Sequence, residues 1–115
     1  MHELSLCHSI ATIVNRFADG RDVDKVHVQV GAFRQVVPET LVYSWELVTD
    51  STALAGSELV VEQIPAVIEC AACGATTTLS LPILKCGSCE TTTVTLRSGE
   101  EFLVTSLDLK GVVHG

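Results

Sequence analysis

The chain has 115 residues, of which 47% are hydrophobic and only 4% aromatic, and it carries a formal net charge of −7. This length suits one domain, or one domain with a small metal-held lobe, around a core of aliphatic side chains. The negative charge argues against nucleic acid as a partner, and no apolar run reaches the 18 residues typical of a transmembrane helix. An odd number of cysteines without a signal-peptide pattern indicates a reducing compartment, so we expect a cytoplasmic protein.

Two amphipathic helices are predicted in the first half of the chain. In the first, apolar residues recur at steps of three and four and Gly20 ends the segment. This apolar face consists of Leu4, Cys7, Ile10, Ala11, Val14, Phe17 and Ala18. The second helix begins at Pro38, because proline fits a first helical turn, and it buries Leu41, Trp45 and Val48. Cys7 is expected to be a small core residue rather than a ligand.

Three strands are predicted around these helices. Residues 26–30 alternate valine with polar side chains, which is typical of a half-buried strand. Residues 58–64 form a second strand that Pro65 ends, and residues 102–109 form a third, with Leu103, Leu107 and Leu109 on one face. The last strand is expected to return to the first sheet. The predicted fold is therefore α+β, with two helices packed on a three-stranded sheet and an inserted zinc-ribbon lobe.

The insertion is predicted to be a separate zinc-binding domain. It spans residues 67–96, and the α+β domain comprises residues 1–66 completed by residues 97–115. Residues 66–69 are interpreted as a connection into the metal site. The threonine-rich stretches at residues 76–81 and 91–96 are predicted to be its short strands.

Four of the five cysteines form two C-x-x-C pairs, which are Cys70, Cys73, Cys86 and Cys89. Two residues between cysteines let one tight turn aim both sulfurs at an ion about 2.3 Å away, and four thiolates complete the tetrahedron of a structural Zn²⁺. Gly74 and Gly87 stand where such turns need a positive φ or a close approach of the backbone. Two disulfides or four unrelated buried thiols are the alternatives, but the doubled motif in so short a chain favours a metal.

The N-terminus is a second candidate metal site. The α-amine of Met1, the backbone nitrogen of His2 and the His2 imidazole can close consecutive chelate rings around one ion. With the amide proton displaced, the three nitrogens lie in a plane, which suits Ni²⁺ or Cu²⁺. Glu3, another backbone nitrogen or a partner residue would fill the remaining position. Taken alone, a histidine at position 2 is typical of a solvated chain end.

The opening MHELSLCHSI, the strand VHVQVGAF and the two cysteine pairs together resemble the HypA/HybF family of hydrogenase nickel-incorporation proteins over essentially the whole chain. The resemblance implies a metallochaperone rather than an enzyme, in which Met1, His2 and Glu3 bind Ni²⁺ as cargo and the four cysteines bind structural zinc. It also implies two partners, a HypB-like GTPase and the precursor of the [NiFe]-hydrogenase large subunit. The chain departs from the family pattern at His8, where glutamine is more frequent, and at Glu90, where glycine or asparagine is more frequent.

Two other functional classes fit part of the pattern. A zinc ribbon that binds nucleic acid would use the same cysteine pairs, but the acidic charge and the Met-His-Glu opening argue against it. A rubredoxin-like electron carrier would hold iron in the same four thiolates, and its visible absorption would distinguish it. The fourth nickel donor and a role for His8 stay open at this point.

Overall fold

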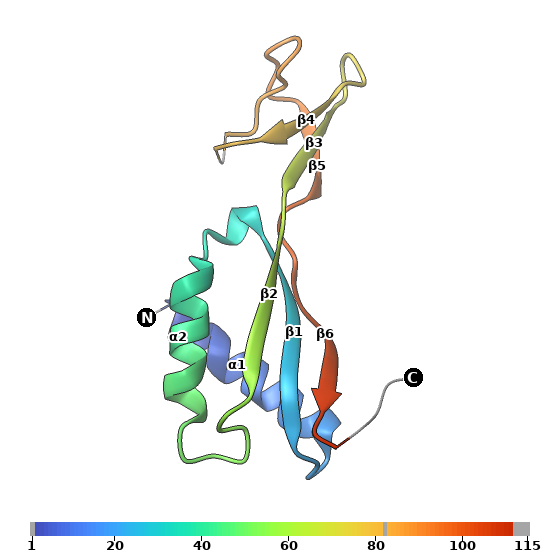
Figure 1. Ribbon diagram of the computed structural model, residues 1–115. Coiled ribbons are helices and arrows are strands. Elements are labelled where there is room, and N and C mark those ends of the chain that lie inside the picture. The colour runs from blue at the N-terminus through green and yellow to red at the C-terminus, as the bar shows by residue number, and fades with distance from the viewer. Residues whose placement is uncertain (1, 82, 112–115) are drawn as a thin grey trace. The chain divides into compact units, whose positions relative to one another are not determined.

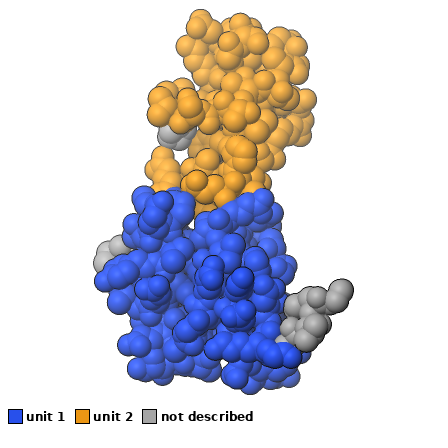
Figure 2. All heavy atoms as spheres, viewed as in Figure 1, with its two compact units in different colours: residues 1–29, 36–62, 103–115 blue, residues 30–35, 63–102 orange. Residues whose placement is uncertain are grey.

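The computed structural model describes residues 2–81 and 83–111, apart from the side chain of His2. Its chain divides into two compact units (Figure 2), which are residues 1–29, 36–62 and 103–115 for unit 1 and residues 30–35 and 63–102 for unit 2. Among the described helices, none is both long and apolar enough to cross a membrane.

Unit 1 contains both helices and most of the first sheet (Figure 1). The elements are α1 (His2–Ala18), β1 (Val23–Gly31), α2 (Pro38–Thr49), β2 (Glu58–Ile64) and β6 (Phe102–Leu109). The sheet has the strand order β2-β1-β6, so the last strand of the chain returns to the first sheet, as predicted, and there it pairs with β1. The helices pack against each other, and α1 crosses one face of the sheet. This confirms the predicted α+β fold.

The core of unit 1 is aliphatic, with one tryptophan. The apolar side chains that are at most 3% exposed come from both helices, from β1 and β2, and from the loop between α2 and β2: Cys7, Ile10, Val14, Ala18, Val23, Val26, Val28, Leu41, Trp45, Leu54 and Leu59. The indole Nε1 of Trp45 donates to Ser57 Oγ at 3.0 Å, and that hydroxyl donates to the Leu54 carbonyl at 2.6 Å. The buried polar atoms of this tryptophan and serine are therefore satisfied, which allows them to lie in an apolar core.

Two side chains expected on the apolar faces lie on the surface instead. Phe17 is 66% exposed and Leu103 is 54% exposed. Phe17 stands at the margin of the α1 stripe, in the last turn of the helix, and Leu103 stands near the start of the edge strand β6. A helix margin and a strand end have neighbours on fewer sides than their central positions, so periodicity overestimates burial there.

Unit 2 contains a second three-stranded sheet. Its strands are β3 (Ala66–Cys70), β4 (Thr76–Leu79) and β5 (Val94–Ser98), in the order β4-β3-β5, and both neighbours run antiparallel to β3. A short 3₁₀-helix, η1 (Ala32–Arg34), belongs to the same unit. Residues 66–69 lead into the first knuckle, as predicted, but they also form most of the central strand, which the sequence pattern did not predict.

The second predicted threonine strand is also shifted along the chain. It was expected at residues 91–96, but β5 begins at Val94. The backbone oxygens of Thr91 and Thr93 instead accept hydrogen bonds from Cys86 N at 2.9 Å and Ala71 N at 3.1 Å. These threonines are part of the metal-site turns, so the strand starts after them.

Gly31 ends β1 at a crossing with Gly99. A side chain at Gly31 would overlap the Gly99 carbonyl, and Gly99 itself has a φ of +118°. The close approach lets Gly31 N donate to Glu101 O and Phe33 N donate to Gly99 O, both at 2.7 Å. Glycine is needed at both positions because it lacks the Cβ that would collide or be strained.

Candidate metal centre

The two cysteine turns share one backbone design. In the first turn, Cys70 N donates to Ala75 O at 2.9 Å and Gly74 N donates to Cys70 O at 3.0 Å. In the second turn, Cys86 N donates to Thr91 O at 2.9 Å and Glu90 N donates to Cys86 O at 3.0 Å. The residue after the second cysteine of each pair has a positive φ, which is 74° at Gly74 and 63° at Glu90. The repeated pattern holds both pairs of sulfurs in equivalent knuckles.

The glycines near these turns have different roles. Gly74 supplies the left-handed conformation that the first turn requires, as predicted. Gly87 has no positive φ, but a Cβ there would lie 3.3 Å from the Thr77 side chain. Its backbone N–H donates to Thr77 Oγ1 at 3.1 Å, which ties the second knuckle to β4.

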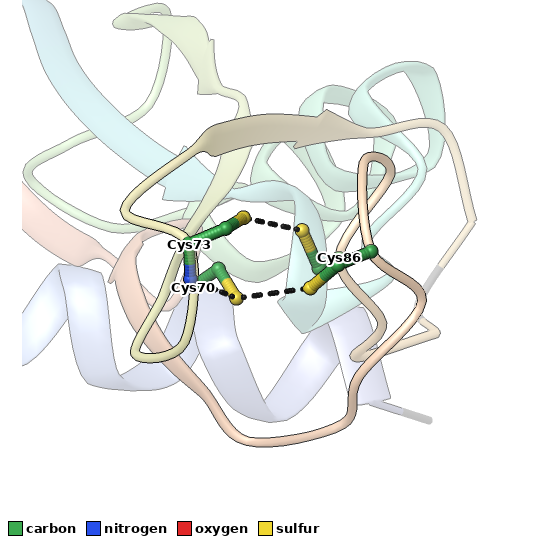
Figure 3. Close-up of side chains that lie close together, drawn as sticks. Cys70, Cys73 and Cys86 are labelled. Carbon is green, nitrogen blue, oxygen red and sulfur yellow. Dashed lines mark hydrogen bonds between the residues drawn. The ribbon is translucent and has the colours of Figure 1, made fainter.

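The structure brings the four predicted cysteines together (Figure 3). Their Sγ atoms lie within 4.8 Å of one another, and the spacing is 3.5 Å from Cys70 to Cys89 and 3.7 Å from Cys73 to Cys86. Four sulfurs about 2.3 Å from a central ion stand about 3.8 Å apart in a tetrahedron. The donor set and its spacing therefore fit a single tetrahedral metal ion.

The same distances argue against the two alternatives. A disulfide needs sulfurs about 2.05 Å apart, and all four cysteines are free. Four unrelated thiols would not converge, whereas these come from two turns and meet at one point. Cys70 and Cys86 are buried while Cys73 and Cys89 are exposed, so the cluster lies at the surface of unit 2.

Backbone N–H groups favour the thiolate form of the first cysteine in each pair. Cys70 Sγ accepts hydrogen bonds from Cys73 N at 3.4 Å and Ala72 N at 3.3 Å. These lower the pKa of the Cys70 thiol, with the Cys73 N–H as the larger cause. The N–H of Cys89 acts in the same way on Cys86, and the pKa of that thiol falls to about 6.

The second cysteine of each pair is held in the protonated form. At Cys89 the N–H of Thr91 lowers the pKa. The neighbouring sulfurs, of which Cys70 has the largest effect, raise it by more, so the pKa of the Cys89 thiol is about 12. At Cys73 the N–H of Ala75 is likewise outweighed by the adjacent thiols, so its pKa is raised. A divalent cation that binds all four sulfurs must displace the remaining protons, and its affinity will depend on pH.

The second candidate site falls mostly outside the described residues. Met1 and the side chain of His2 lie outside them, and α1 begins at His2. Glu3 is half-buried in the first turn of α1, and His8 is exposed on the same helix. The predicted nickel ligands therefore stay a prediction.

Comparison with known proteins gives the cluster and the chain start a context. A family model described as hydrogenase/urease nickel incorporation, metallochaperone, HypA matches residues 1–109. The chain belongs to the HypA family. Two relatives of this HypA-family chain are each named hydrogenase maturation factor HypA. The one from Chloroflexus aurantiacus is 36% identical over 112 residues, covering 94% of this chain and 98% of the relative. The one from Geobacter metallireducens is 33% identical over 110 residues, covering 96% of this chain and 100% of the relative.

Solved HypA structures share the fold. The solution structure of the Ni metallochaperone HypA from Helicobacter pylori matches with a TM-score of 0.65 at 20% identity, covering 95% of this chain and 97% of that one. A second solution structure of a HypA protein matches with a TM-score of 0.56 at 18% identity. The predicted family and fold are thereby confirmed, as is a four-cysteine cluster able to hold a structural metal such as zinc.

Sequence reasoning did not find the backbone groups of the site. The N–H donors to the sulfurs, and the contact between Thr77 and Gly87, depend on turn geometry and on a strand pairing. The one available signal was Glu90, which stands at the position that Gly74 holds in the first pair and has a positive φ.

Proposed function

We propose that this protein binds Ni²⁺ at its N-terminus and helps insert it into the large subunit of [NiFe]-hydrogenase. The Met1 amine, the His2 backbone nitrogen and the His2 imidazole would hold the ion, with Glu3 as a further donor. The observation that carries the proposal is the match to the nickel-incorporation family over residues 1–109, which includes the Met-His-Glu opening.

The start of α1 supports the chelate. The first four N–H groups of a helix have no partner within the helix, and α1 begins at His2. Displacing the His2 amide proton therefore costs no helical hydrogen bond. Glu3 lies in the same first turn, where a carboxylate is favourable beside the positive end of the helix dipole.

The two sites would have different tasks because their donor sets differ. Four cysteine sulfurs enclose one position, so Zn²⁺ bound there would be retained and would hold its lobe together. A chain terminus offers few donors and stays open to a recipient, which suits a metal that must be passed on. We assign nickel to the α+β domain, residues 1–66 with 97–115, and zinc to residues 67–96.

The same assignment implies partners and a compartment. A HypB-like GTPase and the large-subunit precursor would act with the protein in the cytoplasm. No catalytic step is assigned to this chain, since the family is described as a metallochaperone.

The test is a Ni²⁺ titration of untagged protein with its native N-terminus. His2→Gln should abolish tight Ni²⁺ binding and hydrogenase maturation while leaving the zinc content unchanged. Adding one glycine before Met1 should also weaken binding strongly, because it replaces a basic amine by an amide without changing any side chain. Equal Ni²⁺ affinity of native and extended proteins would remove the amine from the site.

Metal analysis of the same sample identifies the ion in the cysteine cluster. Iron in four thiolates absorbs visible light and zinc does not. A colourless protein with one zinc per chain supports the proposal, and a coloured iron protein would favour an electron carrier.

A further inference from the structure

Unit 1 has an open groove between α2 and β2, here called the α2–β2 groove. Two hollows of about 340 and about 360 Å³ lie along α2, and both are lined by Val42. Leu59 lines the first and Val61 the second, and residues two apart on a strand point to the same face. The groove therefore follows β2, which runs beside α2 in Figure 1. Its floor includes the apolar Trp45, with the polar Thr49 and Ser57 beside it.

The strand that borders this groove is an edge strand. In the order β2-β1-β6, β2 pairs only with β1 among the described strands. Its other edge presents backbone N–H and C=O groups that can pair with one more strand. Main-chain pairing at such an edge is a recurring way to bind an extended peptide.

The rim of the α2–β2 groove is acidic. Glu39, Glu46 and Asp50 lie on one side of α2, at helical steps of seven and four, and all are exposed. Glu58 stands opposite, at the start of β2. Within the described residues no lysine, arginine or histidine forms an ion pair with any of these four carboxylates. The α2 sequence PETLVYSWELVT contains no lysine or arginine to offset them.

Charge complementarity indicates what would occupy the groove. Unit 1 contains ten acidic residues against four lysines and arginines, so a second copy of this chain would be repelled. A lysine or arginine can lay its aliphatic stem on the floor at Val42 and place its charge at the rim. Glu46 and Asp50 are one helical turn apart, about 6 Å, which is close to the ~6.7 Å between alternate residues of a strand.

We propose that the α2–β2 groove binds an extended segment of a partner protein, which adds to β2 as a fourth strand and carries lysine or arginine at alternate positions. The basic side chains face the rim carboxylates, and the backbone pairs with the free edge of β2. This docking function uses no nickel or zinc ligand, so its test is independent of the test of the metal sites.

The probe is an acetylated, amidated nine-residue peptide that alternates lysine and threonine, added to the zinc-loaded full chain. Trp45 is the only tryptophan and lines the groove, so its fluorescence reports the affinity. Amide NMR shifts should concentrate on α2 and β2, and intermolecular contacts should show a paired strand. A peptide of the same composition with all lysines in one block should bind at least about fivefold more weakly, because it loses the alternate spacing.

Matched variants separate the groove from general electrostatics. The double variant Glu46→Gln/Asp50→Asn should weaken binding of the alternating peptide at least about tenfold, since it removes the facing charges. Asp22→Asn/Asp24→Asn makes the same change in net charge outside the groove and should leave the affinity within about twofold. Equal losses in both variants, shifts away from α2 and β2, or a peptide bound as a helix would each overturn the proposal.

Discussion

Glu90 occupies a backbone conformation that its side chain disfavours. Its φ is 63°, at the position where the first knuckle has Gly74. A residue with a Cβ in this region costs about 1–2 kcal/mol relative to glycine. The ion pair from Glu90 Oε1 to Lys85 Nζ, at 3.6 Å between exposed groups, offsets little of that cost.

Replacing Glu90 by glycine should therefore stabilise unit 2. We expect Glu90→Gly to raise the free energy of unfolding of the zinc-loaded protein by about 1 kcal/mol, measured by urea denaturation. Glu90→Ala is the control, because it removes the ion pair but keeps the Cβ. If the alanine variant is as stable as the glycine variant, backbone strain is not the cause.

Because of Cys7, the stability of unit 1 is expected to depend on pH in the alkaline range. The side chain is fully buried and its Sγ donates to the Leu41 carbonyl at 3.4 Å. Burial, and secondarily the charge of Glu3 one turn earlier, raise the pKa of this thiol from 9.0 to about 11. The folded state thus favours the protonated thiol, so its contribution to stability is complete below pH 9 and is lost as the pH rises to about 11.

The expected loss is on the order of 1 kcal/mol between pH 8.5 and pH 11. Cys7→Ala removes the titrating group, so its stability should fall less over this range than that of the parent, although it starts lower because a buried atom is lost. The measurement is urea unfolding of zinc-loaded protein at both pH values. Parallel pH profiles would mean that Cys7 does not titrate in this way.

At the scale of elements, the end of β1 depends on the crossing of Gly31 and Gly99. Gly31→Ala should cost at least about 3 kcal/mol, because the new methyl group must push apart two backbone segments joined by 2.7 Å hydrogen bonds. Gly20→Ala is the control: its φ is +82°, but nothing lies within 4 Å of the added carbon. It should cost only about 1 kcal/mol. Thermal unfolding of the two variants compares them directly, and similar costs would contradict the steric argument.

At the same scale, the strand conformation of β3 depends on its pairing with other strands. Residues 66–70 pair on one side with β4 and on the other with β5, through registers such as Ile68 with Thr77 and with Leu96. Glu69 forms an ion pair with Arg97 across the same sheet. A five-residue segment directly after Pro65 has too little pattern to predict as a strand, and its partners lie far away along the chain, as Ser98 does from Val67. Its conformation is set by non-local pairing.

For the whole molecule, loss of the metal should affect the two units unequally. Structural zinc contributes on the order of 10 kcal/mol to the folding of small domains. Cys86→Ala removes one of the four donors, so we expect the zinc to be lost and residues 66–98 to lose hydrogen-exchange protection. Unit 1 buries its own aliphatic core, so α1 and α2 should stay protected.

Metal content and amide exchange of the Cys86→Ala variant test this division of stability. Cys7→Ala is the matched cysteine control and should keep one zinc per chain, because Cys7 lies in the core of unit 1. Full zinc retention by Cys86→Ala would count against a four-thiolate site. Equal loss of protection in both units would show that they fold as one.

The sequence by itself determined what depends on neighbours along the chain. The steps of three and four in α1, the proline at the start of α2 and the alternation in β1 are local patterns, and the structure has these elements. The two C-x-x-C pairs are local as well, because two residues of spacing suffice to shape a knuckle. The bounds of β2 and β6 also match the prediction.

Only the tertiary structure decided what depends on residues far apart in the chain. It made β3 a central strand, exposed Phe17 and Leu103, and placed Gly31 against Gly99. It also brought the four sulfurs together and placed acidic side chains of α2 beside the free edge of β2. The physical reason is that burial, close backbone approach and strand pairing are properties of pairs of segments, and a pattern within one segment does not contain its partner.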